Sequence, residues 1–513
     1  MFRRVDGRLP GRVCRASLTG AIGVTLILGA FGWGSALAAP TTSSNIPPRC
    51  ERLVERTTQF DPGVDVRAQT LAWRDELIPL SGRGLAAYRP NTEQEALWFH
   101  SLAWLIPIVT TDPDRVERVV TEYGQALPDP GPEAPRLQSR LAGWNEGQIR
   151  RRLETMECLY LVTRRESFAD MARVLGSALM DDRRYYGRPL YPPHNHGAQA
   201  NRLLIRVGPL FGRPEWVTRS RERVLEDRRE AFADCGMSDE QSSGYQWMNV
   251  ALWERLAQLV RVPLDPAPRA AARALVRPDG VVEAVGDGQT RRGKLGGGLL
   301  WCSDEGWAAN TREGMHYVLR FGPTTKRHGH EDHAALTWFT RGTPVLVDRG
   351  AAPKSDPAAL EWSRGVGAHS TLERVGATGP RAMTGERVGL DSYALQSTSG
   401  DPHRRSVRFT PEAVFVTDRA RAPETSTWIQ HWHFAPGWEP KRDRDGRATG
   451  EMVGPDGAVV RLACTQAGTP VIPEPVRVRS YAGEYSQWAW DMQCRMRGKQ
   501  VTANSEITWI AGG

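Results

Sequence analysis

Hydrophobic and polar positions follow different patterns in the two halves of the chain. Between about residues 50 and 265, apolar residues recur at helical spacing, most clearly at 95–109, 148–162 and 250–260. From about residue 281 onward there are short alternating runs separated by turn residues, which predict antiparallel strands. These runs lie at 317–321, 334–339, 344–347, 406–416, 427–434 and 459–464. Helices first and strands second indicate two packed layers of different kinds rather than an alternating α/β sheet.

The change of pattern also predicts where the domains divide. A segment rich in Pro, Ala and Arg at 263–277 separates the helical part from the strand-rich part. A length of 513 residues is enough for two or more domains. We therefore predict an α+β multidomain chain, with a helical domain at 39–275 and an antiparallel β-domain at 276–513.

The N-terminus has the features of an export signal. Five arginines in the first 15 residues precede an uncharged stretch at 16–39, and Ala36-Leu37-Ala38 fits a small-x-small cleavage pattern. We predict a cleaved signal peptide at 1–38, which places the mature protein in the periplasm or outside the cell. The uncharged stretch is long enough to span a bilayer, so an uncleaved anchor is the alternative. No later segment has a transmembrane pattern, and no stable membrane insertion is expected after cleavage.

The charge balance argues against nucleic acid as a partner. The formal net charge is +8, but the residues after position 38 hold 62 basic and 58 acidic side chains, a net charge of +4. This excess is too small to indicate nucleic-acid binding, although it allows a local basic cleft for an anionic substrate.

The cysteines permit disulfides in an oxidising compartment. Cys14 lies in the predicted signal, and six cysteines remain, an even number without the spacing of metal-binding pairs. Cys464 and Cys494 fall in the same strand-rich region and are the preferred pair. An equally weighted alternative is that most of the six are buried free thiols. The six are Cys50, Cys158, Cys235, Cys302, Cys464 and Cys494.

Two groups of candidate functional residues lie in the helical part. His194, Asn195 and His196 are crowded among helix-breaking residues, which predicts a loop or a helix start. Helix capping alone would explain Asn195, but it explains a pair of histidines less well. Tyr245 follows a Ser-Ser-Gly turn 49 residues after His196. Taken alone, such a tyrosine is interpreted as a packing residue with a hydrogen-bonded tip.

A third group, richer in chemistry, lies in the strand-rich part. His328, His330, Asp332 and His333 are followed by Asp348 after a hydrophobic strand and by His369 further on. Alternation within a strand would place His328 and His330 on the same face. Imidazole and carboxylate together suit zinc, and a site made of His330, Asp348 and His369 has plausible ligand chemistry. The alternative is a polar turn with satisfied histidines.

In this order, the three groups resemble the heparinase II/III-like polysaccharide lyases, a family related to alginate and oligoalginate lyases. The resemblance extends over residues 140 to 375. The order in which its motifs follow one another is more specific than any single motif. The matching motifs are Trp144-Asn-Glu with Arg151 and Arg152, Asn195-His196-Gly197, Glu240 to Tyr245, Pro278-Asp279-Gly280 with Gly286-Asp287, His328-x-His330-x-Asp332, Asp348-x-Gly350 and His369-Ser-Thr.

The resemblance implies an incomplete α/α toroid followed by an antiparallel β-sandwich. It also implies β-elimination on a uronate-containing acidic polysaccharide. Tyr245 would be the catalytic base and acid, His196 an alternative base or carboxylate neutraliser, Asn195 the ligand of the substrate carboxylate, and His328 the residue that completes the site. His330, Asp348 and His369 would match the family's structural zinc ligands.

The chemistry of elimination fits these residue types. Removal of the C5 proton of a uronate leaves a carbanion conjugated with its carboxylate, whose charge must be neutralised by polar or cationic donors. A base must reach C5 and an acid must protonate the O4 leaving group. Because a tyrosine has a pKa of ~10, nearby positive charge is expected to lower the pKa of Tyr245. A glycoside hydrolase would need two opposed carboxylates, and no compelling pair is present.

Two other functions remain open from the sequence. The motif from His328 to His333 also fits the di-metal site of metallo-β-lactamase-like hydrolases, but some 200 residues of predicted helix precede it here. Such a hydrolase would carry the motif early in a fold in which helices and strands interleave. The second alternative is a non-catalytic glycan-binding or exopolysaccharide-assembly protein on the same scaffold, because a fold does not determine function.

Overall fold

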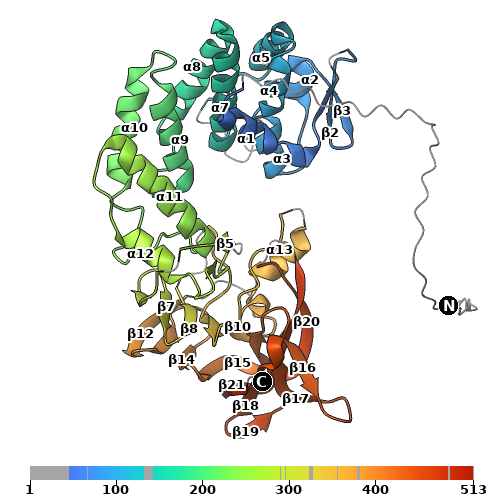
Figure 1. The fold of residues 1–513 in the computed structure, drawn as a ribbon, viewed down its shortest axis with the longest axis vertical. Helices are drawn as coiled ribbons and strands as arrows, with labels where there is room; N and C mark the ends of the chain where they lie inside the picture. Colours follow the sequence, from blue (N-terminus) through green and yellow to red (C-terminus); the bar gives the residue numbers. More distant parts are fainter. Residues whose placement is uncertain are drawn as a thin grey trace, which may run out of the picture. The chain divides into compact units, whose positions relative to one another are not determined.

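The computed structural model describes residues 46–511, except 66, 132–142, 289–290, 295, 323–326, 355, 378–381 and 483–485. The predicted signal peptide at 1–38, including Cys14, lies outside the described residues. Helices come first along the chain and strands follow (Figure 1). Within the described ranges, no helix is long and apolar enough to cross a membrane.

Eleven helices precede the main sheets in the described part of the chain. They are α1 (Pro48–Glu55), α2 (Gly82–Ala87), α3 (Glu93–Phe99), α4 (Ile106–Val109), α5 (Pro113–Ala126), α7 (Glu146–Thr163), α8 (Glu166–Met180), α9 (Asn195–Val207), α10 (Pro214–Asp227), α11 (Ser243–Val260) and α12 (Ala267–Ala274). Helices α7 and α11 contain the predicted segments 148–162 and 250–260. Helix α7 begins with a capping box, in which Asn145 and Gln148 each accept from the other's backbone N–H group.

Two features of the helical part differ from the prediction. The segment 95–109 is not one helix, because α3 ends at Phe99 and Leu102 adopts a left-handed conformation with φ of 59°. Pro107 has no N–H group to donate, and the chain places it in the first turn of α4, where none is needed. The second feature is a small antiparallel sheet that the helical pattern hides. Its strands are β1 (Gly63–Asp65), β2 (Thr70–Trp73) and β3 (Glu76–Pro79).

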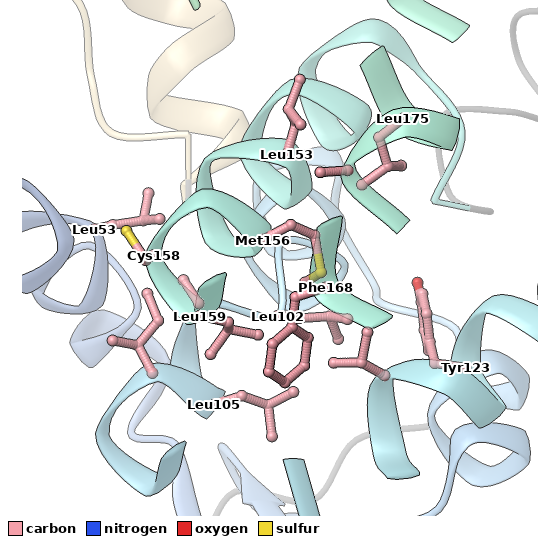
Figure 2. Close-up of a cluster of buried hydrophobic side chains, with 14 of the residues drawn as sticks. Leu53, Leu102, Leu105, Tyr123, Leu153, Met156, Cys158, Leu159, Phe168 and Leu175 are labelled. Atoms are coloured by element: carbon pink, nitrogen blue, oxygen red, sulfur yellow. The ribbon is translucent and has the colours of Figure 1, made fainter. Parts of the chain in front are cut away.

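The core of the helical part forms where α7 packs against its neighbours (Figure 2). Leu153, Met156 and Leu159 recur at helical spacing along α7 and are fully buried. Phe168 and Leu175 of α8 pack in the same cluster. A disulfide between Cys50 and Cys158 joins α1 to α7 beside this cluster. The core therefore fixes α7, whose first turn carries part of the candidate site.

The strand-rich part contains two large antiparallel sheets. The first has the order β10-β9-β8-β7-β6 and the second the order β12-β13-β14-β15-β21-β18-β17-β16, with β11 and β20 added at β15 and β21 and β19 added at β18. The first sheet comprises β6 (Leu300–Cys302), β7 (Trp307–Arg312), β8 (Met315–Arg320), β9 (Ala335–Thr340) and β10 (Thr343–Leu346). The second comprises β11 (Leu372–Arg374), β12 (Met383–Gly389), β13 (Ser392–Ser397), β14 (His403–Phe409), β15 (Ala413–His433), β16 (Glu439–Arg442), β17 (Ala448–Val453), β18 (Val459–Gln466), β19 (Thr469–Val471), β20 (Glu474–Ser480) and β21 (Gln487–Ala511). Outside them lie the pair β4 (Val281–Val282) and β5 (Arg291–Arg292), and helix α13 (Pro357–Arg364).

The predicted strands are present, with two changes of boundary. The run 406–416 is divided between β14 and β15 by a turn in which the Thr410 N–H group donates to the Ala413 carbonyl. Pro411 lies in this turn, as expected for a residue that cannot donate to a sheet. Conversely, the run 427–434 is the end of the long strand β15 rather than a separate strand.

The two large sheets share one hydrophobic core, which confirms the predicted sandwich. Leu319 and Trp338 from the five-stranded sheet lie in the same buried cluster as Val416, Trp432 and Met492 from the eleven-stranded sheet. All strand pairs in both sheets are antiparallel. The described residues from Ile46 onward form one compact unit, so the boundary at 275/276 stays a prediction, although it falls between α12 and β4.

The described residues contain three disulfides. The predicted pair Cys464–Cys494 is confirmed, and Cys50–Cys158 and Cys235–Cys302 account for the other four cysteines. The alternative of mostly free thiols is therefore wrong. Cys302 lies in β6 and Cys235 precedes α11, so this disulfide joins the helical part to the five-stranded sheet.

Candidate active site

The candidate active site begins at the N-terminus of α9, as predicted for a helix start. The cap is His194, whose Nδ1 accepts from the His196 backbone N–H group at 3.1 Å. Asn195 is the first residue of the helix and is buried. Its Nδ2 donates to both carboxylate oxygens of Glu240, each at 2.9 Å. Asn195 is thus held by a buried acid rather than used as a cap, and Glu240 acquires a role that the motif alone did not indicate.

The next residue, His196, is held by a different carboxylate. Its Nδ1 lies 3.1 Å from Glu146 Oε2 at the start of α7, while its side chain remains 45% exposed. Glu146 also accepts from Arg150 Nε at 3.0 Å. Burial raises the pKa of Glu146, but Arg150 and His196 outweigh burial and hold the pKa below its ordinary value. An ionised Glu146 therefore orients the imidazole and leaves His196 Nε2 for another partner.

The Ser-Ser-Gly sequence suggested that Tyr245 follows a turn. In the structure, Tyr245 lies in the first turn of α11. The Ser242 hydroxyl caps the helix by accepting from the Tyr245 N–H group at 3.4 Å. The Tyr245 ring stacks on His328, with centroids 3.5 Å apart and an interplanar angle of 12°. Burial, followed by the charges of Asp287 and Glu240, raises the pKa of Tyr245 to about 12. The expectation that positive charge lowers this pKa is therefore wrong for the free protein, because the nearest carboxylates outweigh Arg364.

The segment from His328 to His333 forms a loop between β8 and β9, so the prediction of strand alternation is wrong. His328 and His330 nevertheless point to one carboxylate. His328 Nδ1 donates to Asp287 Oδ2 at 2.9 Å, and His330 Nε2 donates to Asp287 Oδ1 at 3.1 Å. Arg364, at the end of α13, donates to the same carboxylate at 2.6 Å.

Asp287 is the residue around which this part of the site is organised. Burial raises its pKa, but hydrogen bonds from His328, His330 and Arg364 hold the pKa far below its ordinary value. Sequence reasoning noted Asp287 only as part of the Gly286-Asp287 motif. The Gly286-Asp287 motif was the only sequence feature that pointed to Asp287. A single carboxylate in a sequence does not indicate which side chains it contacts in the fold.

Three of the four predicted catalytic residues meet in one network. Glu240 binds Asn195, and Glu240 Oε2 lies 3.6 Å from His328 Nε2. His328 in turn stacks on Tyr245. The fourth residue, His196, follows Asn195 on α9 and is tied to Glu146. Asn195, His196, Tyr245 and His328 are called the candidate cluster below.

The predicted metal ligands also come together. His330, Asp348 and His369 are buried, and each offers a ligand atom within 4.8 Å of the others. His369 Nδ1 donates to Asp348 Oδ2 at 2.8 Å. Two buried ring nitrogens of the group, His330 Nδ1 and His369 Nε2, have no hydrogen-bond partner. Since His330 Nε2 is already oriented by the Asp287 carboxylate, the group has both the donors and the supporting contact typical of a metal site.

A second group of His431, His433 and Asp491 also has metal-ligand geometry, but its chemistry differs. His431 Nδ1 donates to Asp491 Oδ2 at 2.8 Å, and Nε2 donates to Glu373 Oε2 at 2.7 Å. Burial lowers the pKa of His431, but the two carboxylates outweigh it and raise the pKa to about 9. A ring that donates from both nitrogens is an imidazolium and has no lone pair for a metal.

This imidazolium predicts a pH-dependent stability. The pKa of His431 in the folded protein is about 9, which is above the value of ~6.5 in the unfolded chain. The stabilisation by His431 is therefore complete below pH ~6.5 and is lost as the pH rises through about 9. We expect the free energy of unfolding in urea to fall by roughly 2 kcal/mol over this range. In His431→Gln the stability should be lower at pH 6 and nearly flat to pH 9.5. An unchanged slope in the variant would assign the pH dependence to other groups.

Comparison with known proteins defines the class of the fold. Residues 296–489 match the family model described as heparinase II/III-like, C-terminal. A crystal structure of heparinase III is similar with a TM-score of 0.66 at 14% identity, covering 83% of this chain and 79% of that one. The heparan sulfate lyase HepC from Pedobacter heparinus has a TM-score of 0.54 at 13% identity, covering 93% and 86%. No curated protein sequence matches the chain.

The fold is therefore the helical toroid followed by an antiparallel sandwich, as predicted. Residues 296–489 of its strand-rich part are similar to the C-terminal domain of heparinase II/III-like proteins. The metallo-β-lactamase-like alternative is wrong for this chain, because its fold would interleave helices and strands around the motif. The relation to alginate lyases stays a prediction.

Proposed function

We propose that this protein is a polysaccharide lyase that cleaves a uronate-containing acidic polysaccharide by β-elimination. The observation that carries the proposal is the convergence of Asn195, Tyr245 and His328, from two helices and a distant loop, around Glu240 and Asp287. The similarity in fold to heparinase III and heparan sulfate lyase supports an acidic glycan as the substrate class.

The protonation states favour a division of labour between Tyr245 and His196. With its pKa raised to about 12, Tyr245 is a neutral phenol at neutral pH and can donate a proton to the O4 leaving group. His196 has Nε2 available and is oriented by Glu146, as a general base requires. The C5–H bond breaks as the proton passes to His196, the C4–C5 double bond forms, and the C4–O4 bond breaks as Tyr245 protonates O4. The resemblance assigned both roles to Tyr245, with His196 as the alternative base.

The remaining residues fit the task of holding a substrate carboxylate. Asn195 is fixed by Glu240, so its amide is held in place before substrate arrives. Asp287 accepts from His328, His330 and Arg364 and balances the charge of the Arg364 guanidinium, which keeps these donors in place. We propose that Asn195 and His328 neutralise the uronate carboxylate during proton removal.

The group of His330, Asp348 and His369 would hold a structural zinc ion. Two imidazoles and a carboxylate are typical zinc ligands, and buried ring nitrogens without partners fit a cation better than an empty polar core. Bound zinc would supply a fixed positive charge that anchors the loop from His328 to His333. The chain's own contribution is to align His330 through Asp287.

A metal assay checks this site without relying on activity. Purified protein should contain about one zinc per chain by elemental analysis, and His369→Ala should lose it and unfold several degrees lower. His316→Gln is the matched control, since His316 is equally buried but is bonded to Thr311 in the five-stranded sheet and is not part of the proposed zinc group. Equal zinc content in His369→Ala and the parent protein would remove the assignment.

We further propose that the chain is exported to the periplasm or beyond. Three disulfides in the described residues are the supporting observation, because disulfides persist in oxidising compartments.

The lyase proposal is tested by ultraviolet absorbance over time with heparan sulfate, chondroitin sulfate, hyaluronan and alginate. Elimination leaves a conjugated unsaturated uronate that absorbs, whereas hydrolysis and binding do not. A rise with one of these polymers establishes the lyase and identifies its substrate. New reducing ends without absorbance would instead indicate a hydrolase, and binding without either would indicate a non-catalytic glycan-binding protein.

A further inference from the structure

The exposed face of the eleven-stranded sheet carries a groove that the candidate cluster does not use. The groove has a volume of about 620 Å³ and is lined by β13, β14, β15, β21 and the turn before β14. Three arginines line it, namely Arg404, Arg419 and Arg421. The other lining side chains are mostly hydroxyls and amides, and none is acidic or carries a phenyl, phenol or indole ring.

Strand register gathers these arginines into a continuous row. Arg404 of β14 lies directly opposite Arg419 of β15, and Arg419 lies opposite Thr502 of β21. Arg421, two residues beyond Arg419, points to the same face and lies opposite Gln500. Like charges placed directly opposite each other in neighbouring strands destabilise a sheet. The row therefore costs stability unless an anion compensates it.

The described part of the chain does not compensate these charges. Among the described residues, no carboxylate forms an ion pair with Arg404, Arg419 or Arg421. Asp401, beside the turn that lines the groove, is already paired with Arg374 at 2.5 Å. On the buried face of the same strands the pattern is the opposite, since Arg405 is paired with Asp418 at 2.7 Å. The exposed arginines are thus the uncompensated ones.

We propose that this groove is a second, non-catalytic binding site for an acidic glycan chain. Guanidinium groups bind sulfate and carboxylate oxygens in a planar, bidentate manner, and the neighbouring hydroxyls and amides match sugar hydroxyls. A lining without phenyl, phenol or indole rings lacks the stacking surface that single-stranded nucleic acids use. The choice of a glycan rests on the proposed function. A site separate from the reacting residues would keep a long substrate attached between cleavage events.

The test is binding of the full chain to immobilised heparan sulfate and to immobilised hyaluronan, measured by surface plasmon resonance. All variants carry Tyr245→Phe so that the polymer survives the measurement. Arg404→Gln/Arg419→Gln should weaken binding at least tenfold and reduce its dependence on salt. The matched control is Arg444→Gln/Arg447→Gln, which removes the same charge from exposed positions near β16 and β17 and should change binding less than twofold. Loss on heparan sulfate alone identifies sulfate as the ligand, and loss on both polymers identifies carboxylate.

Binding within twofold of the parent on both polymers, or an equal loss in the control pair, would overturn the proposal. In an otherwise wild-type chain, Arg404→Gln/Arg419→Gln should cleave a short oligosaccharide at an unchanged rate, because the groove is not part of the candidate cluster. If binding is lost specifically and no polysaccharide gives an ultraviolet signal with wild-type protein, the groove is retained as a binding site and the lyase proposal is rejected. If a polysaccharide gives an ultraviolet signal but the groove variant keeps its binding, the lyase proposal is retained and the groove is rejected as a binding site.

Discussion

Replacing Tyr245 by phenylalanine is expected to lower kcat for polysaccharide cleavage by about 10³-fold or more. The variant keeps the ring that stacks on His328 and loses only the hydroxyl that, in the proposed mechanism, protonates O4. Because the hydroxyl acts on the leaving group in the transition state, KM should change by only a few fold. The rate of ultraviolet absorbance increase at saturating and limiting polysaccharide measures both constants.

A matched control and a second substrate make this prediction specific. Tyr160→Phe removes a hydroxyl from a half-buried tyrosine on α7 that lies outside the candidate cluster, and it should leave the rate unchanged. If Tyr245 is the acid, a uronide with a nitrophenolate leaving group at O4 should be cleaved by Tyr245→Phe almost as fast as by the parent. A large defect on this activated substrate as well would show that Tyr245 is the base. A variant that retains most of its activity on the polymer would exclude Tyr245 from the chemistry.

The fold was predictable where local pattern and tertiary packing agree. The apolar positions of α7 point to the core and its capping box is visible in the sequence, so its location was clear. The segment 95–109 is even richer in apolar residues, but Pro107 and the left-handed Leu102 break it into α3 and α4. Strands β1 to β3 are only three or four residues long, too short for an alternating pattern to emerge from a helical context.

The site was predictable as a set of residues and not as a set of contacts. The histidines and Asp348 of the proposed zinc group were identified by their donor chemistry, and the structure brings them together. The carboxylates Glu146, Glu240 and Asp287 were not identified as organising residues, because their partners lie tens of residues away along the chain. The pKa of Tyr245 could not be predicted for the same reason, since its direction depends on burial and on which charges lie closest.

Asp287 is a positioning residue whose loss we expect to be the second most damaging. Asp287→Asn has the same shape but cannot accept from His328, His330 and Arg364 together, because its amide group is a donor. His328 then loses the contact that fixes its ring under Tyr245. We expect a decrease in kcat of about 10²-fold, comparable with losses seen when a group orienting a catalytic or ligating histidine is removed. Asp391→Asn is the matched control, because Asp391 is also buried and accepts from Asn310, Tyr317 and Arg312 far along the chain from the site.

The pH profile distinguishes positioning from a general loss of structure. After burial, the charge of Asp287 is the largest cause of the raised pKa of Tyr245, so its removal should bring that pKa down from about 12. An acid must be protonated to act, so activity is lost as pH rises through its pKa. In the parent protein this loss lies beyond the accessible range, whereas in Asp287→Asn the remaining activity should begin to fall at a lower pH than in the parent. A merely destabilised protein would lose activity at every pH in proportion, as Asp391→Asn is expected to do if it loses any, and a flat alkaline profile in Asp287→Asn would contradict the role of Tyr245 as the acid.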